Sequence, residues 1–275
     1  MQINNVQLDQ SPYINLNQSL NRIASGKEIT SAADDASSLA ISDQLRTEAS
    51  GISQSIDNIN SGLASLQIAD KSISEQSNIL DTVKEKLLQA STDTTSQEGR
   101  EQILTEIKDL LENFDDIAAS TNYNEQTLLQ NASDDKSASE SLQFQSGTSS
   151  EDVIETPSIQ SNTVGVGLET LINQDPSSFD ASTARAYLGD VDSALTTLND
   201  YRGDLGSSQN QLQSSGSNLI SQYTSTRDAL STISDLDYTS EITNFNKQNI
   251  LAQIGAYGAA QSNNINQNIV TRLLT

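Results

Sequence analysis

Three pairs of adjacent carboxylates are the residues of this sequence best suited to chemistry, and that chemistry would be calcium binding. The pairs are Asp34-Asp35, Asp115-Asp116 and Asp134-Asp135. Calcium sites gather about six to eight oxygen ligands, and none of the pairs lies in the spacing of an EF-hand loop. Carboxylates also cap helices and hold surface water. The sequence therefore favours capping or hydrated roles for the three pairs and predicts no metal site.

The sequence has no histidine and no cysteine. It therefore lacks the commonest general base and metal ligand, and it can form neither a disulfide nor a thiolate. It also contains no P-loop, no H-E-x-x-H zinc motif, no G-x-S-x-G nucleophile elbow and no C-x-x-C pair. We therefore expect no enzymatic activity and no cofactor.

The chain is strongly acidic, with 37 acidic and 14 basic residues and a formal net charge of −23. A surface of this sign repels the phosphate backbone, so no nucleic-acid partner is expected. No run of about 18 apolar residues is present, which argues against membrane insertion. The first residues lack the basic and apolar regions of a secretory signal, so we expect no cleaved signal peptide.

The elements that carry these side chains are predicted to be long helices. Between about 43 and 90 an apolar residue recurs at every seventh position. The residue four positions after it is apolar at first and polar from Asp70 on. A repeat of this length indicates a helix packed as in a coiled coil, over about 43–90. An isolated two-stranded coiled coil is the alternative. Every seventh residue is a branched aliphatic one: Leu45, Ile52, Ile59, Leu66, Ile73, Leu80 and Leu87.

A second seven-residue repeat supplies a partner for this stripe and predicts a helix over 183–236. A shorter helix is predicted over 98–120. Residues 131–180 are rich in Ser, Asp and Gly and lose periodicity, so we expect only a small β element there, with short strands at 153–154 and 164–166. The apolar residues of the second repeat are Val191, Leu198, Leu205, Leu212 and Leu219.

Both ends of the chain are predicted to be amphipathic helices whose apolar faces find no cover inside the subunit. The first begins near Pro12, which follows a good capping serine, and the last spans about 240–273. We expect these helices to be mobile in a free subunit and to become ordered on association. The residues predicted to drive association are Leu16, Leu20, Ile23, Ile242, Phe245, Ile250, Ile254, Tyr257, Ile265, Ile269 and Leu273.

Four stretches carry a resemblance to bacterial flagellins, the shortest being Leu142 to Gln145, which resembles the FQ-x-G start of a β-hairpin in this family. The run from Ser25 to Leu45 reads SGKEITSAADDASSLAISDQL and is similar to the family signature SG-x-x-I-x-SA-x-DDA-x-x-LAIS. Residues 121–130 resemble the TxFNGxxLL segment, with Tyr123 in place of the phenylalanine and Glu125 in place of the glycine. The C-terminal text NFNKQNILAQIGAYGAAQSNNINQNIVTRLL resembles the flagellin C-terminus in the form found in epsilonproteobacteria.

The resemblance covers about 1–145 and 185–275, so the gap leaves no room for the large outer domains of many flagellins. Together with the repeats it predicts a mostly α fold: an elongated bundle of long antiparallel helices with coiled-coil packing, a small β-hairpin element in the middle, and paired terminal helices. Residues 1–42 with 237–275 would form a terminal helix-pair domain that lines an inner tube, with a linker around 25–42. Residues 43–236 would form the long-helix bundle, including a β or loop region at about 131–180.

The function that this resemblance implies is that of a structural subunit that self-assembles into the helical flagellar filament for motility, outside the cell. A hook–filament junction protein and a secreted, non-polymerising flagellin-like signalling protein remain as alternatives. The partners that the resemblance implies are other copies of the chain, a flagellar export chaperone of the type III apparatus, the filament cap and hook-junction proteins.

The resemblance also marks a surface on the first long helix that stimulates the vertebrate innate flagellin receptor. The family reads LQRVRELAVQ there, and this chain reads LDTVKEKLLQ. Thr82 replaces an arginine and Lys86 a leucine, while Lys84 and Glu85 keep only the charge. Because a threonine cannot supply the bidentate guanidinium, we expect a weak receptor response. The same positions could instead serve only contacts between neighbouring subunits.

Overall fold

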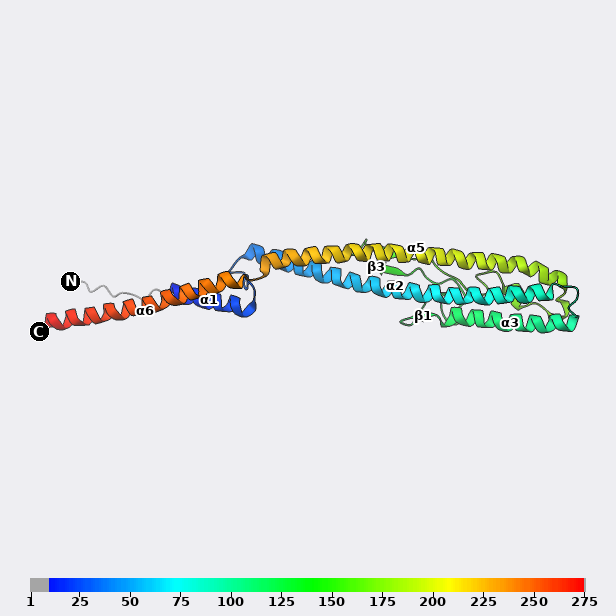
Figure 1. Ribbon diagram of the computed structural model, residues 1–275, viewed down its shortest axis with the longest axis horizontal. Coiled ribbons are helices and arrows are strands. Elements are labelled where there is room, and N and C mark those ends of the chain that lie inside the picture. Colours follow the sequence, from blue (N-terminus) through cyan, green and yellow to red (C-terminus); the bar gives the residue numbers. More distant parts are fainter. Residues whose placement is uncertain (1–9, 275) are drawn as a thin grey trace. The chain divides into compact units, whose positions relative to one another are not determined.

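The computed structural model describes residues 10–274, with the side chains of all of them except 273 and 274. Helices dominate the described chain (Figure 1). Four short strands and a 3-10 turn (Pro176–Ser178) lie between the third and fifth helices of this part of the chain. The mostly α fold with a small β element is confirmed. The helices are α1 (Ser11–Ser25), α2 (Ala36–Ala90), α3 (Gln97–Ser120), α4 (Glu169–Ile172), α5 (Ala181–Ser234) and α6 (Tyr238–Leu274).

The chain forms two compact units. One unit, which we call the terminal unit, contains the chain up to Ser50 and from Thr224 onwards. The other, which we call the bundle unit, spans Gly51–Tyr223. The boundaries fall inside α2 and α5, so each of these helices contributes residues to both units.

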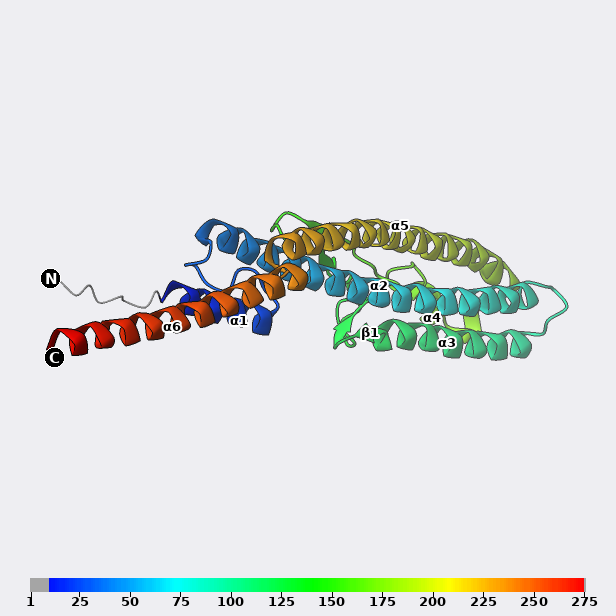
Figure 2. The same ribbon diagram turned by 60° about the vertical axis from the view of Figure 1, so that its left-hand side comes forward.

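In the bundle unit α2 and α5 run antiparallel, and α3 folds back along α2 (Figures 1 and 2). Their apolar stripes meet in one continuous buried cluster. Burying one aliphatic side chain of this size stabilises the fold by about 1.5–3 kcal/mol before entropy is counted. The buried stripe residues are Ile52, Ile59, Leu66, Ile73, Leu80 and Leu87 of α2, and Val191, Leu198, Leu205, Leu212 and Leu219 of α5.

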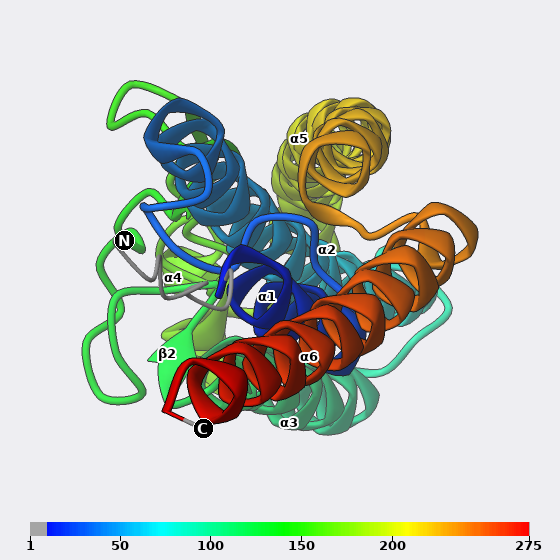
Figure 3. The same ribbon diagram turned by 90° about the vertical axis from the view of Figure 1, so that its left-hand side faces the viewer.

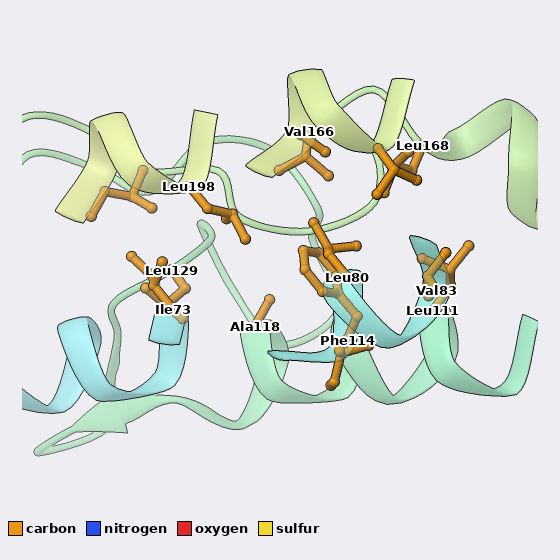
Figure 4. Packing of buried hydrophobic residues seen from close by; sticks show 14 of the residues in the cluster. Ile73, Leu80, Val83, Leu111, Phe114, Ala118, Leu129, Val166, Leu168 and Leu198 are labelled. Atoms are coloured by element: carbon orange, nitrogen blue, oxygen red, sulfur yellow. The ribbon is translucent and has the colours of Figure 1, made fainter. Parts of the chain in front are cut away.

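The irregular middle of the chain completes this core. Figure 4 shows Val166 and Leu168, which precede α4, on the side of the core opposite Phe114 of α3. Leu80 of α2 lies between these two layers. The partner of the two long helices is therefore a third helix together with a loop segment, and no isolated two-stranded coiled coil forms in this unit.

Polar residues interrupt the second heptad position of α2, and two of them pair with α5. Arg202 Nε donates to Asp70 Oδ1 at 2.9 Å, and Lys84 forms an ion pair with Asp192. These side chains are partly exposed, and such pairs contribute about 0–1 kcal/mol each. Apolar burial therefore supplies most of the stability, and the ion pairs match the antiparallel register of the helices.

The helix α2 begins at Ala36, so the start predicted near residue 43 is wrong. Asp35 Oδ1 accepts hydrogen bonds from the N–H groups of Ser37 and Ser38 at 2.9 and 3.1 Å. A helix start leaves four N–H groups without partners, and a capping carboxylate satisfies two of them. The prediction followed the apolar repeat alone, whereas side-chain capping carries the helix beyond the repeat.

The strands β1 (Asn122–Tyr123) and β2 (Gln126–Thr127) form a hairpin where the expected family pattern has a glycine. Asn124 and Glu125, at φ 51° and 69°, both adopt the left-handed backbone conformation. A two-residue hairpin turn of this kind requires it. Glu125 therefore preserves the turn without the freedom of glycine, at a cost of about 1–2 kcal/mol.

The strands β3 (Gln143–Gln145) and β4 (Val153–Glu155) pair antiparallel, with Phe144 opposite Ile154. This confirms the predicted β-hairpin. The hairpin lies against α2, because the Ser55 hydroxyl donates to the Gly147 carbonyl oxygen at 3.0 Å. The Phe144 ring lies so close to Gly62 that an added Cβ would come within 2.9 Å of it. A small residue in α2 therefore lets the hairpin approach the helix.

The prediction of a strand at 164–166 is wrong, because these residues form a turn. The Val166 N–H donates to the Asn162 carbonyl oxygen at 3.0 Å, which is a helix-like bond. Gly165 allows the tight path, since a Cβ there would collide with the carbonyl oxygen of Gln160. The valines suggested a strand, and the backbone space required by the turn decided otherwise.

Candidate functional site

The terminal unit contains the helices α1 and α6, which lie antiparallel side by side (Figures 1 and 3). The Tyr13 hydroxyl donates to the Ala252 carbonyl oxygen at 3.4 Å, and the Tyr238 hydroxyl to the Ile23 carbonyl oxygen at 3.5 Å. Gly26 ends α1 in the left-handed conformation, with φ at 69°. The start of α1 near Pro12, predicted from the sequence, is confirmed, but the capping role predicted for Ser11 is wrong, because Ser11 already belongs to the helix and Gln10 is its N-cap.

The two connections α1–α2 and α5–α6 are tied together by backbone hydrogen bonds. The Glu28 N–H donates to the Ser234 carbonyl oxygen at 2.9 Å, and the Leu236 N–H to the Gly26 carbonyl oxygen at 3.1 Å. These bonds make a short antiparallel bridge next to the start of α6. The linker predicted around 25–42 is therefore a structured connection in which the chain also begins α2.

Asp34 organises the turn between this bridge and α2. Its Oδ2 atom accepts four hydrogen bonds at 2.9–3.1 Å, from the N–H and hydroxyl groups of Thr30 and Ser31. The bonds favour the charged carboxylate, and chiefly the Thr30 hydroxyl lowers the pKa of Asp34 from 3.8 to about 2. The first carboxylate pair thus orders a turn and caps a helix.

Arg22 of α1 connects this turn to α6. Its guanidinium lies 3.7 Å from Asp34 and 3.9 Å from Glu241, whose side chain is almost fully buried. Opposite charges at these distances attract each other more strongly where one partner is shielded from water. The arrangement holds α1, the connection and the first turn of α6 together.

The helices α1 and α6 touch each other partly through small residues, and many of their large apolar residues face outward. Ser19 and Ala252 are buried, whereas Ile254 and Tyr257 are 61% and 77% exposed. Of the residues predicted to drive association, three are half-buried, namely Leu16, Ile23 and Phe245. Leu273 belongs to α6, but its side chain lies outside the described part. The exposed ones are Leu20, Ile242, Ile250, Ile254, Tyr257, Ile265 and Ile269.

In the described parts of these helices the sequence analysis missed three further exposed large aliphatic residues, Ile14, Leu251 and Val270. Leu251 and Val270 stand directly beside predicted members of the stripe, so a wider stripe would have included them. Their presence enlarges the apolar surface of the pair. Large exposed apolar surfaces on soluble proteins mark interaction sites.

The predicted receptor-surface positions lie on α2 in the bundle unit. Thr82 and Glu85 are exposed. Lys84 pairs with Asp192 of α5, and Lys86 with Glu106 of α3. The two lysines are therefore engaged with neighbouring helices of the same subunit. Among the predicted packing residues, Leu45 differs from the rest because it is only half-buried.

Two other kinds of site were considered over the described residues. None of the acidic side chains in 10–274 gathers into a group of three or more that could hold a metal ion. Within the same residues no helix combines the length and the apolar character needed to cross a membrane. The exposed faces of α1 and α6 are therefore the candidate functional site.

Comparison with known proteins matches both ends of the chain to one family. The bacterial flagellin N-terminal helical region matches residues 1–134, and the bacterial flagellin C-terminal helical region matches 188–274. The chain is 31% identical over 263 residues to the flagellar filament 30.7 kDa core protein of Treponema maltophilum, covering 92% of this chain and 90% of that protein.

Two further matches are a shorter stretch of higher sequence identity and a solved structure of similar fold. Flagellin A of Helicobacter mustelae is 46% identical over 116 residues, which are 42% of this chain and 24% of that protein. A solved structure of a proposed flagellar hook-associated protein from Vibrio parahaemolyticus has a TM-score of 0.61 at 12% identity, covering 74% of this chain and 100% of that chain. At this identity the likeness concerns the fold alone.

Proposed function

This chain belongs to the bacterial flagellin family and is a structural, non-enzymatic subunit of the flagellar filament, and we propose that it polymerises through its terminal helix pair. The observation that carries the proposal is a contrast in burial. The stripes of the bundle unit are buried within one subunit, whereas the large apolar residues of α1 and α6 remain exposed. In the proposed filament, other copies of the chain cover these exposed residues.

Burial of these faces supplies the driving force for assembly. Each exposed aliphatic side chain that becomes covered contributes about 1.5–3 kcal/mol, which opposes the loss of freedom on association. Contacts between different faces of successive copies extend a helical array without closing it. In this proposal residues 1–42 and 237–275 line the inner tube of the filament.

Further partners belong to the same proposal and are supported by family membership. They are an export chaperone, the filament cap and hook-junction proteins. Export would proceed through the flagellar type III apparatus without a cleaved signal peptide. The two alternatives, a junction protein and a non-polymerising secreted protein, have no observation in their favour, and the filament core protein matched over nearly its full length favours the filament.

A pair of substitutions on α6 tests the assembly surface. Ile254→Asp places a charge on the apolar face, and burying it without a partner costs several kcal/mol, about 2–7 even for a neutral polar group. Gln261→Asp adds the same charge at an exposed polar position of the same helix. We expect the first variant to stay helical by circular dichroism and form no filaments, and the second to polymerise, as followed by sedimentation and electron microscopy.

Truncation gives the complementary test. Deleting 1–30 or 243–275 should leave a soluble, helical, monomeric protein, because the bundle unit contains its own core. Filaments of normal appearance from either truncated chain, or from Ile254→Asp, would contradict the proposal. The assembly surface would then have to lie on the bundle unit alone.

A further inference from the structure

A pocket with basic walls lies in the terminal unit, between the start of α2, the end of α5 and the connection after α1. Its volume is about 280 Å³, and it is lined by the basic residues Lys27, Arg46 and Arg227. Three aliphatic residues, Ile29, Leu39 and Leu230, also line it. Its walls thus combine positive charge with apolar surface.

The charge of this pocket differs in sign from that of the chain. Its two acidic residues already have partners, since Asp43 pairs with Arg46 at 3.0 Å and Asp235 accepts a hydrogen bond from Ser231. Among the described residues Lys27 has no ion-pair partner. With three basic and two acidic residues the pocket carries a net charge of +1, whereas the whole chain carries −23.

The complementary charge lies in the bundle unit. Residues 51–223 contain 27 acidic and 8 basic residues, a net charge of −19, and the terminal unit contains only 10 acidic and 6 basic residues. Half of the basic residues of the terminal unit therefore line one pocket. Opposite charges brought together at an interface select its register and suppress wrong contacts.

We propose that this pocket receives an acidic side chain from the bundle unit of a second copy of the chain. The inference rests on the proposed polymerisation and adds to it a polar contact away from the apolar faces of α1 and α6. Ordinary ligand pockets measure about 300–1,000 Å³. This cavity is slightly smaller, and its size suits one or two inserted side chains. The aliphatic walls contact the carbon stem of the inserted residue, and the ammonium group of Lys27 holds its carboxylate.

Seeded polymerisation of the full chain tests the proposal. Sheared filament seeds are added at about 0.15 M salt, where exposed charges farther apart than roughly 8 Å are screened. The protein left in the supernatant is then measured. Lys27→Glu should raise this concentration about tenfold, because an attraction becomes a repulsion. Lys71→Glu makes the same charge change at an exposed position of α2 in the bundle unit and should raise it less than about twofold.

Circular dichroism and thermal unfolding of both variants should match the wild type, because both lysines are exposed. Equal effects of the two substitutions would overturn the proposal, since net charge alone would explain them. Calorimetry with inorganic phosphate is a second test. If phosphate binding required Lys27 while Lys27→Glu polymerised normally, the proposal would also be overturned. A wild-type chain that forms no filaments would overturn the proposed function itself, whereas normal polymerisation of Lys27→Glu would overturn only the role of the pocket.

Discussion

The same substitution at two glycines of the bundle unit should change stability in opposite directions. Alanine is favoured over glycine inside a helix by about 0.5–1 kcal/mol. At Gly203 in α5 nothing lies within 4 Å of an added Cβ, so Gly203→Ala should gain this full amount. At Gly62 in α2 the environment reverses the sign.

An alanine Cβ at Gly62 would meet three atoms of the Phe144 ring at 2.9–3.1 Å. The ring has little room to retreat, because β3 is paired with β4 and the hairpin is bonded to Ser55. Overpacking of this kind costs about 1–3 kcal/mol, which exceeds the gain in helix propensity. Gly62→Ala should therefore lower the free energy of unfolding by about 1–2 kcal/mol.

Urea unfolding of the monomeric full chain, followed by circular dichroism, measures both effects. Midpoints are compared, because a chain with two units need not unfold in one step. Adding Phe144→Leu to Gly62→Ala should recover part of the loss, since the smaller side chain relieves the contact. If Gly62→Ala raised the midpoint as much as Gly203→Ala, the close approach of the hairpin to α2 would be refuted.

Three other substitutions test separate parts of the chain. Arg100→Ala removes two hydrogen bonds, to the carbonyl oxygens of Ala90 at the end of α2 (3.0 Å) and of Thr92 in the turn that follows (2.9 Å), and should lower the free energy of unfolding by about 1–3 kcal/mol in urea. Arg46→Ala, in an exposed pair, should change it by less than about 0.5 kcal/mol. The pKa of Asp34 is lowered from 3.8 to about 2 in the folded state, so its contribution to stability is present above pH 4 and is lost as the pH falls towards 2. Over this range the melting temperature of Asp34→Asn should therefore fall less steeply than that of the wild type. In a receptor reporter assay the unchanged chain should elicit a weak response and Thr82→Arg a stronger one. A full response to the unchanged chain would contradict this expectation.

The sequence by itself determined the long helices and their buried stripes. A repeat of seven residues is a local property, and it places Ile59 or Leu205 on the same face as the residues one repeat away wherever the helix lies. Water then forces that face inward, so the identity of the core residues of α2 and α5 followed without knowledge of the fold. The apolar character of the terminal helices was equally readable.

Tertiary structure decided the features that depend on residues far apart in the chain. Val164 lies in a turn although its neighbours suggest a strand, because the loop must fit over the core. The pairing of Arg202 with Asp70, and the closeness of Phe144 to Gly62, exist only once helices and hairpin are packed. Local propensities differ by about 1 kcal/mol per residue or less, and packing of distant residues readily exceeds this, so such contacts cannot be read from either segment alone.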